Sequence, residues 1–283
     1  MTADVETTMA RTTKSPVEPA PLFATRRWKR LRATIGILAT QLAILVVFLG
    51  FWEHATSSNT AIAFMFGSPS AIAGFLGQMV RDGSLVRDTY VTGLETLLGF
   101  FVGNLFGTLI GLSLWYSRFV SRVVEPFIIA LGSIPIIALA PIIIIWFGTG
   151  LVSKVAMSTL SVVIVALVTS YKGAVGVDPD QINLMRTLGA SKFQIFRKLV
   201  VPASLTDIFA GLKLTVGFAL IGAIVGEFMS SSEGLGHAIF KAGSLYVIPK
   251  VFAALVVTIA LALLLTFIVG KIERLLMPWR RQI

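Results

Sequence analysis

The stretch VTGLETLLGFFVGNLFGTLIGLSLWY, residues 91–116, contains one charged side chain, Glu95. A bilayer core about 30 Å thick is crossed by a helix of about 20 apolar residues, so this stretch predicts a transmembrane helix. A glycine recurs at every fourth position along it, at Gly99, Gly103, Gly107 and Gly111. This spacing places the glycines on one helix face, where a second helix can approach closely.

The rest of the chain has the same character. Of its 283 residues, 55% are hydrophobic and 13% are charged, and the mean hydropathy is +0.87. A soluble domain has about a quarter charged residues. Five further apolar runs are long enough to span a bilayer, at 33–52, 124–147, 151–171, 207–229 and 251–269. We therefore predict an all-α polytopic membrane protein with six transmembrane helices.

Two segments depart from a plain run of helices. The run at 124–147 contains Pro126, Pro135 and Pro141, and breaks of this kind are tolerated where the backbone is buried in protein or lines a cavity. The segment 53–90 is mixed in character, its helical stretch at 71–80 is too short to span, and it is expected on the outer side. Within it, Ser68 and Pro69 have the pattern of a helix start, which predicts a short interfacial helix over 71–80.

The net charge of +10 is unevenly distributed. Lys and Arg gather in four segments that a six-helix topology places on one side, at 26–32, 118–122, 172–198 and 271–281. Because positive residues accumulate on the cytoplasmic side, this pattern predicts that both termini are cytoplasmic in a bacterial inner membrane. It also favours membrane orientation over nucleic-acid binding as the reason for the positive charge.

The same patterns divide the chain. Residues 1–32 are expected to form a disordered basic tail, since their first part is rich in Thr, Pro and Ala without periodicity. The first transmembrane helix (33–52) and the outer segment (53–90) follow. A core is expected over 91–270, with a cytoplasmic loop at 178–202, and residues 271–283 form a second cytoplasmic tail.

Several kinds of chemistry have no residues to support them. The chain has no Cys, and its two His residues, His54 and His237, are far apart in sequence, so we expect no metal site and no membrane-embedded enzyme. A phosphate-binding loop requires Gly-x4-Gly-Lys followed by Ser or Thr. Here Gly270-Lys271 is followed by Ile272, so ATP hydrolysis by this chain is not expected.

The loop at 178–202 predicts two short helices. Asp178 is a suitable N-cap and Pro179 suits the first helical position. The first helix is expected to end at Gly189, a common left-handed terminator. Ser191 and Gln194 then have capping-box spacing, and the second helix is expected to end at Pro202.

The apolar side chains of this loop fall on two edges, Leu184 with Leu188, and Phe193 with Phe196 and Val200. An ordered amphipathic helix pair indicates a docking element. The alternative is a connector held at the membrane surface by its basic residues.

The spacing in this loop resembles a known family. Asn183-Leu184-Met185 is followed by three residues, Gly189, nine residues, and then Leu199-Val200-Val201-Pro202. The permeases of binding-protein-dependent ABC importers have this spacing after a Glu-Ala-Ala triplet, which is Asn-Leu-Met here. Other family-like motifs are Ser133-Ile134-Pro135, Gly226-Glu227 and Ser232-Glu233-Gly234-Leu235-Gly236. The resemblance covers about residues 65–270 and is closest to the branch for nitrate, sulfonates, taurine, bicarbonate or pyrimidine precursors.

The resemblance implies a type I importer permease with cytoplasmic coupling helices. Its expected partners are a second permease copy, two ATP-binding subunits that carry ATP and Mg, and an external solute-binding protein, with transport by alternating access. The residues expected to contact the ATPase are Asn183, Leu184, Met185, Arg186, Leu188, Gly189, Ala190, Ser191, Phe193 and Pro202.

Polar residues within the spans are candidates for a translocation pathway. Buried carboxylates are costly in membranes and usually face a cavity or a partner, which singles out Glu95 and Glu227. Asn104 and Ser133 are further candidates, although interhelical hydrogen bonds would explain them equally well. A stand-alone secondary transporter or channel is the alternative function, but it predicts inverted sequence halves and intramembrane charge pairs, neither of which is evident in the sequence.

Overall fold

The computed structural model describes residues 23–276, with side chains from residue 35 onward, and all regular structure in this part is helical. Five helices are long and apolar enough to cross a membrane: Ile35–Ser58, Ser84–Tyr116, Leu151–Val175, Lys192–Ser230 and Ile248–Leu276. Two bent helix pairs raise this number to seven if each pair is one span. The all-helical, multi-spanning fold is confirmed. Of the predicted tails at 1–32 and 271–283, residues 1–22 and 277–283 lie outside the described residues, whereas 23–32 and 271–276 are helical, so the disordered tail predicted over 1–32 does not extend over 23–32.

The chain divides into two compact units, residues 1–52 and 53–283. The first unit contains most of α1 (Phe23–Ser58), which begins ahead of the predicted start at residue 33. Its Phe48 and Trp52 rings pack with centroids 5.9 Å apart, as expected for aromatic residues one helical turn apart.

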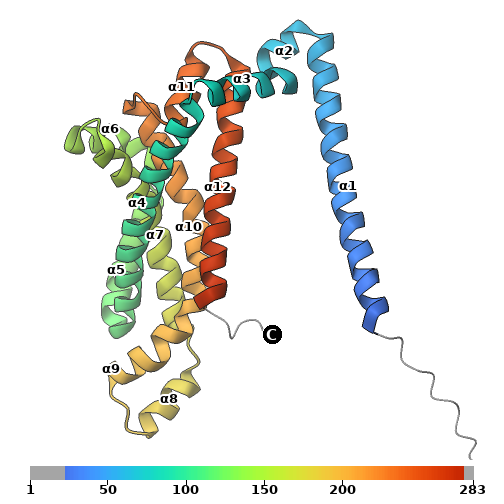
Figure 1. Ribbon diagram of the computed structural model, residues 1–283. Coiled ribbons are helices and arrows are strands. Elements are labelled where there is room, and N and C mark those ends of the chain that lie inside the picture. Colours follow the sequence, from blue (N-terminus) through green and yellow to red (C-terminus); the bar gives the residue numbers. More distant parts are fainter. Residues whose placement is uncertain (1–22, 277–283) are drawn as a thin grey trace, which may run out of the picture. The chain divides into compact units, whose positions relative to one another are not determined.

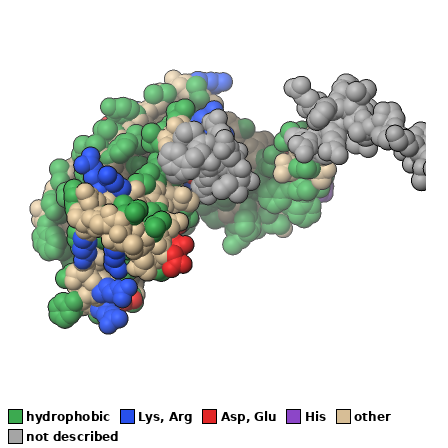
Figure 2. Space-filling view, turned by 90° about the horizontal axis from the view of Figure 1, so that it is seen from below, with side chains coloured by type: hydrophobic (Ala, Val, Ile, Leu, Met, Phe, Trp, Pro, Cys, Tyr) green, Lys and Arg blue, Asp and Glu red, His purple; other side chains and the backbone are tan. Residues whose placement is uncertain are grey.

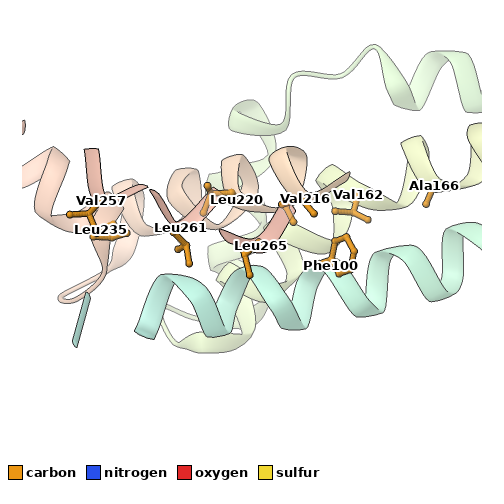
Figure 3. Packing of buried hydrophobic residues seen from close by; sticks show 10 residues of the cluster. Phe100, Val162, Ala166, Val216, Leu220, Leu235, Val257, Leu261 and Leu265 are labelled. Carbon is orange, nitrogen blue, oxygen red and sulfur yellow. The ribbon is translucent and has the colours of Figure 1, made fainter. Parts of the chain in front are cut away.

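The second unit is built around three helices that pack side by side, α4 (Ser84–Ser113), α7 (Leu151–Val175) and α10 (Val201–Ser230) (Figure 1). A fourth long helix, α12 (Ile248–Leu276), packs along them. Buried apolar side chains from all four helices form one core cluster, which includes the residues labelled in Figure 3: Phe100, Val162, Ala166, Val216, Leu220, Leu235, Val257, Leu261 and Leu265.

The predicted glycine face is where α4 meets α7. All four glycines are buried. A Cβ added to Gly103 would lie 2.6 Å from Val162 Cβ, and one added to Gly107 would lie 2.5 Å from the carbonyl oxygen of Val163. Because glycine has no side chain, the α4 and α7 backbones lie closer together than any other residue at these positions would allow.

The proline-containing run forms two helices rather than one, α5 (Arg118–Gly132) and α6 (Ile136–Phe147), bent by 92°. The bend lies at Pro135, whose backbone is extended and begins α6. Pro126 and Pro141 are accommodated inside α5 and α6. Of the three predicted breaks, only the one at Pro135 is present.

The outer segment contains α2 (Thr60–Phe66) and α3 (Pro69–Arg81), bent by 42°. The predicted start of α3 is confirmed, since the Ser68 hydroxyl accepts a hydrogen bond of 3.2 Å from the N–H of Ala71. After α10, the shorter helix α11 (Leu235–Ser244) leads to α12.

Candidate functional site

The loop between α7 and α10 is a structured helix pair, α8 (Pro179–Thr187) and α9 (Lys192–Ile195), as predicted. Asp178 caps α8 by accepting from the N–H of Asp180 at 2.9 Å. Helix α8 ends in a left-handed turn at Gly189, with φ of +77°. The Ala190 N–H reaches back to the Met185 carbonyl at 3.0 Å, which completes a Schellman motif.

The start of α9 also follows the prediction. Ser191 accepts from the Gln194 N–H, and the Gln194 side chain accepts from the Ser191 N–H, which together form the capping box. Both helix ends that face each other across Gly189 are therefore closed by local hydrogen bonds. The pair holds its shape without a partner.

The helix pair has one side packed on the membrane core and one side open. Ile195 and Val200 are buried in a cluster with Leu112, Ala174 and Val177. The open side carries Leu184, Leu188 and Phe193, which are 61%, 76% and 59% exposed.

The two predicted apolar edges are thus only partly correct. Leu184 and Leu188 do lie together on the open side, but Phe193 separates from Phe196 and Val200. Val200 is fully buried, and Phe196 packs on the rings of Trp115 and Tyr116. The second edge starts exposed at Phe193 and becomes buried by Val200, because the helix that carries it continues into the core.

The prediction that the second helix ends at Pro202 was wrong. A π-helical turn, η2 (Phe196–Val200), connects α9 to α10, and Pro202 lies in the first turn of α10. Proline lacks an N–H and its ring crowds the carbonyl four residues earlier, so a wider turn ahead of it lets the helix continue. Lys192–Ser230 is therefore one continuous helical run.

Basic side chains dominate the end of the second unit that carries α8 and α9. Viewed from that end, Lys and Arg side chains are spread over the face and acidic side chains are few (Figure 2). Lys192 reaches from α9 to the carbonyl of Tyr116. The open apolar side chains therefore lie within a positively charged surface.

A polar cluster lies near the opposite end of the three-helix core. Glu227 of α10 is 1% exposed and accepts a 2.6 Å hydrogen bond from the Thr92 hydroxyl of α4. Its other oxygen accepts from the N–H of Gly236. Thr92 in turn accepts from the N–H of Leu235 at 2.8 Å, so Glu227 and Thr92 together hold the start of α11 against α4.

Glu95 lies beside this cluster, a proximity that sequence reasoning did not predict. It is 3% exposed and interacts directly with Glu227. Sequence reasoning missed the third charge, Lys154 of α7, which is 2% exposed and donates to the carbonyls of Thr149 and Ser230. The one available indication was a lysine near the start of the apolar run at 151–171.

The other two candidate pathway residues lie elsewhere. Asn104 is buried, donates to the Phe100 carbonyl at 2.8 Å and accepts from the Thr215 hydroxyl at 3.1 Å, so it links α4 to α10. It also lines an apolar cavity of about 620 Å³. Ser133 is exposed at the bend before α6, where it donates to the Ile129 carbonyl.

These observations define a polytopic helical membrane protein with a helix pair that presents apolar side chains outside the bundle. The family of the binding-protein-dependent transport system inner membrane component matches residues 103–279, and the chain belongs to this family. It is accordingly a multi-pass inner-membrane protein and the permease of a binding-protein-dependent ABC importer. ATP hydrolysis in this family takes place on a separate subunit.

Individual relatives agree. The formylaminopyrimidine transport permease protein of Halalkalibacterium halodurans is 33% identical over 78% of this chain and 90% of its own length. A putative aliphatic sulfonates transport permease protein of Bacillus subtilis is 28% identical over 84% of this chain and 87% of its own. An inward-facing structure of the MetNI methionine ABC transporter aligns with a TM-score of 0.62 at 22% identity, over 69% of this chain and 96% of that one, and shows the shared fold.

Proposed function

We propose that this permease works as a pair of identical chains and that its open helix pair α8–α9 docks in a groove on an ATPase subunit. The residues proposed to couple to the ATPase, either by direct contact or by supporting the contact surface, are Asn183, Leu184, Met185, Arg186, Leu188, Gly189, Ala190, Ser191, Phe193 and Pro202. Two ATPase subunits carry ATP and Mg, a solute-binding protein docks on the outer face, and both termini of the permease lie in the cytoplasm.

One observation carries the docking proposal. Three large apolar side chains, Leu184, Leu188 and Phe193, stand open on an element whose other side is packed on the core. Leaving such side chains in water is unfavourable by about 1.5–3 kcal/mol each relative to burial. Met185 packs inward with the cluster around Ile195 and supports this surface rather than contacting the partner.

We further propose that the transported solute is a small uncharged nitrogen heterocycle of the pyrimidine type. The formylaminopyrimidine permease has the higher identity of the two relatives described above, 33% against 28% for the sulfonate permease. Three of the predicted pathway residues lie on core helices: Glu95 and Asn104 on α4, and Glu227 on α10. We propose that the fourth, Ser133, lines the pathway at the bend before α6.

The docking proposal is tested with Leu188→Asp. Leu188 is 76% exposed, so the substitution leaves the core packing intact. A carboxylate facing an apolar groove removes a favourable burial and adds an unpaired charge, and we expect ATPase co-purification in detergent to fall at least about tenfold.

Leu275→Asp is the matched control. Leu275 is also 76% exposed and lies near the end of a different helix, α12, outside the α8–α9 pair. It should co-purify the ATPase as the wild type does. Equal co-purification by both variants, or an equal loss in both, would contradict the docking role.

A further inference from the structure

The end of the second unit opposite to α8 and α9 contains a concave pocket of about 640 Å³. Three segments form it, namely α4, the start of α7 and the turn after α10. The residues that matter to its chemistry are Leu94, Glu95, Leu151, Lys154, Ser230 and Glu233. The volume lies in the range of small-molecule sites.

Two buried polar atoms of this pocket have no partner. Four side-chain oxygens are buried without a hydrogen bond among the described residues, and two of them are Glu95 Oε2 and Ser230 Oγ. Buried polar groups are almost always hydrogen-bonded because an unpaired one is costly. Two such atoms on residues that line one pocket indicate a site where a ligand supplies the missing hydrogen bonds.

The polar groups around the pocket select the kind of ligand. Lys154 donates to the carbonyls of Thr149 and Ser230, so its hydrogen-bonding capacity is largely used within the protein. Glu233 is paired with Arg87 at 3.9 Å, and Glu95 shares a hydrogen bond with Glu227, so neither carboxyl group presents a free charge to the pocket. The unused oxygen of Glu95 can only accept a hydrogen bond, so an N–H donor fits it, whereas an anion, which only accepts, does not.

The second carboxylate behind the pocket is already satisfied. Glu227 accepts from Thr92 and from the backbone of Gly236, which leaves Glu95 as the carboxylate with an unused oxygen. Leu94 and Leu151 add apolar surface suited to the face of a flat ring.

We propose that this pocket binds a planar nitrogen heterocycle with an exocyclic amino group. The amino group donates to Glu95 Oε2, and a ring nitrogen accepts from the Ser230 hydroxyl. Glu95 is then the residue that selects amino-heterocycles over anionic solutes. The inference rests on the proposed import of a heterocycle and adds its binding site within the permease.

The absence of cysteine from the chain permits a direct binding test. Ser232 lines the pocket and is exposed, so Ser232→Cys introduces a single reactive thiol at its rim. The rate of thiol labelling is measured on the full chain in lipid nanodiscs, with 4-amino-2-methylpyrimidine or ethanesulfonate as the added probe. We expect the aminopyrimidine to slow labelling and ethanesulfonate to have no effect.

Two further substitutions in this background test the assigned contacts. Glu95→Met keeps a side chain of similar length but removes the accepting oxygen, and should raise the aminopyrimidine concentration needed for protection several-fold. Ser230→Ala should raise it several-fold, since one neutral hydrogen bond is lost. Glu125→Gln, an exposed carboxylate on α5 remote in sequence from the pocket, should leave protection unchanged.

The outcomes separate the site from the transport function. Protection by aminopyrimidine that depends on Glu95 and Ser230 supports the site. No protection, or protection that is equal in Glu95→Met, overturns it, even if the complete transporter imports an aminopyrimidine and so upholds the proposed function. Protection by ethanesulfonate instead overturns the site, and ATP-driven uptake of ethanesulfonate but not aminopyrimidine overturns the proposed substrate class as well.

Discussion

Replacing Gly107 by Ala should destabilise the permease, because α4 and α7 meet at this position. The added Cβ would lie 2.5 Å from the carbonyl oxygen of Val163 and 2.7 Å from Ala166 Cβ. Ordinary van der Waals contact begins at 3.4 Å, so the helices would have to separate by about 0.9 Å. A separation of that size forfeits a quarter to a half of the dispersion energy of the contacts along the interface.

The magnitude follows from two opposing effects. Overpacking costs about 1–3 kcal/mol, and the upper end applies because the clash is with a backbone carbonyl that cannot rotate away. Alanine recovers about 1 kcal/mol of helix propensity over glycine. The net expectation is a loss of about 2 kcal/mol.

Gly217→Ala is the matched control. Gly217 also lies within a long helix, α10, but an added Cβ would meet nothing within 4 Å, so this variant should gain up to about 1 kcal/mol. At about 2–4 °C per kcal/mol, the two variants should melt about 6–12 °C apart. Intrinsic tryptophan fluorescence in detergent measures this. A Gly107→Ala variant that melts at or above Gly217→Ala would refute the close-packing argument.

Two buried polar contacts give further predictions for the same melting assay. Thr92→Val removes the hydroxyl that joins Glu227 to the start of α11, and with it two hydrogen bonds, so the free energy of unfolding should fall by about 2–4 kcal/mol. Thr258→Val is the control, because the Thr258 hydroxyl donates only to the Ala254 carbonyl of its own helix. This control should lose less than about 1 kcal/mol. Equal melting temperatures would disprove the holding role of Thr92. Lys213→Met removes the ammonium group paired with Glu273 and should destabilise the permease by about 1–3 kcal/mol. Combining it with Glu273→Leu removes the carboxylate left unpaired and should recover most of that loss. A double variant that is less stable than the single one would count against the pairing.

Much of the fold could be predicted because hydropathy and glycine spacing are local properties of the sequence. The run predicted at 151–171 is helical over Leu151–Val175, and the glycine face of α4 lies where its period places it. The caps of α8 and α9 were equally predictable, since each depends on residues within four positions of one another.

The polar cluster could not be predicted in detail because its contacts are distant in sequence. The Thr92–Glu227 hydrogen bond joins residues 135 positions apart, and the Leu235–Thr92 bond joins residues 143 positions apart. Sequence reasoning could mark Glu95 and Glu227 as unusual, but only the fold brings them together with Lys154. Nor could sequence reasoning pair Lys213 of α10 with Glu273 of α12, which are 60 positions apart.

The continuation of the helix through Pro202 changes how the two ends of the permease can communicate. With a rise of about 1.5 Å per residue, Lys192–Ser230 is about 58 Å long, well beyond the bilayer core of about 30 Å. One continuous helical run therefore carries Phe193, on the proposed docking side, and Glu227 and Ser230, at the proposed solute pocket. Because a continuous helix moves as a body, a tilt imposed on α9 by a docked ATPase would shift Glu227 relative to Thr92 and Glu95. The one irregular turn of this run, η2, lies directly after α9 and can absorb a local movement of α9. The regular helix α10 begins after this turn and extends to the proposed pocket. On this geometry, the solute pocket would respond to the ATPase through the inclination of a single helix.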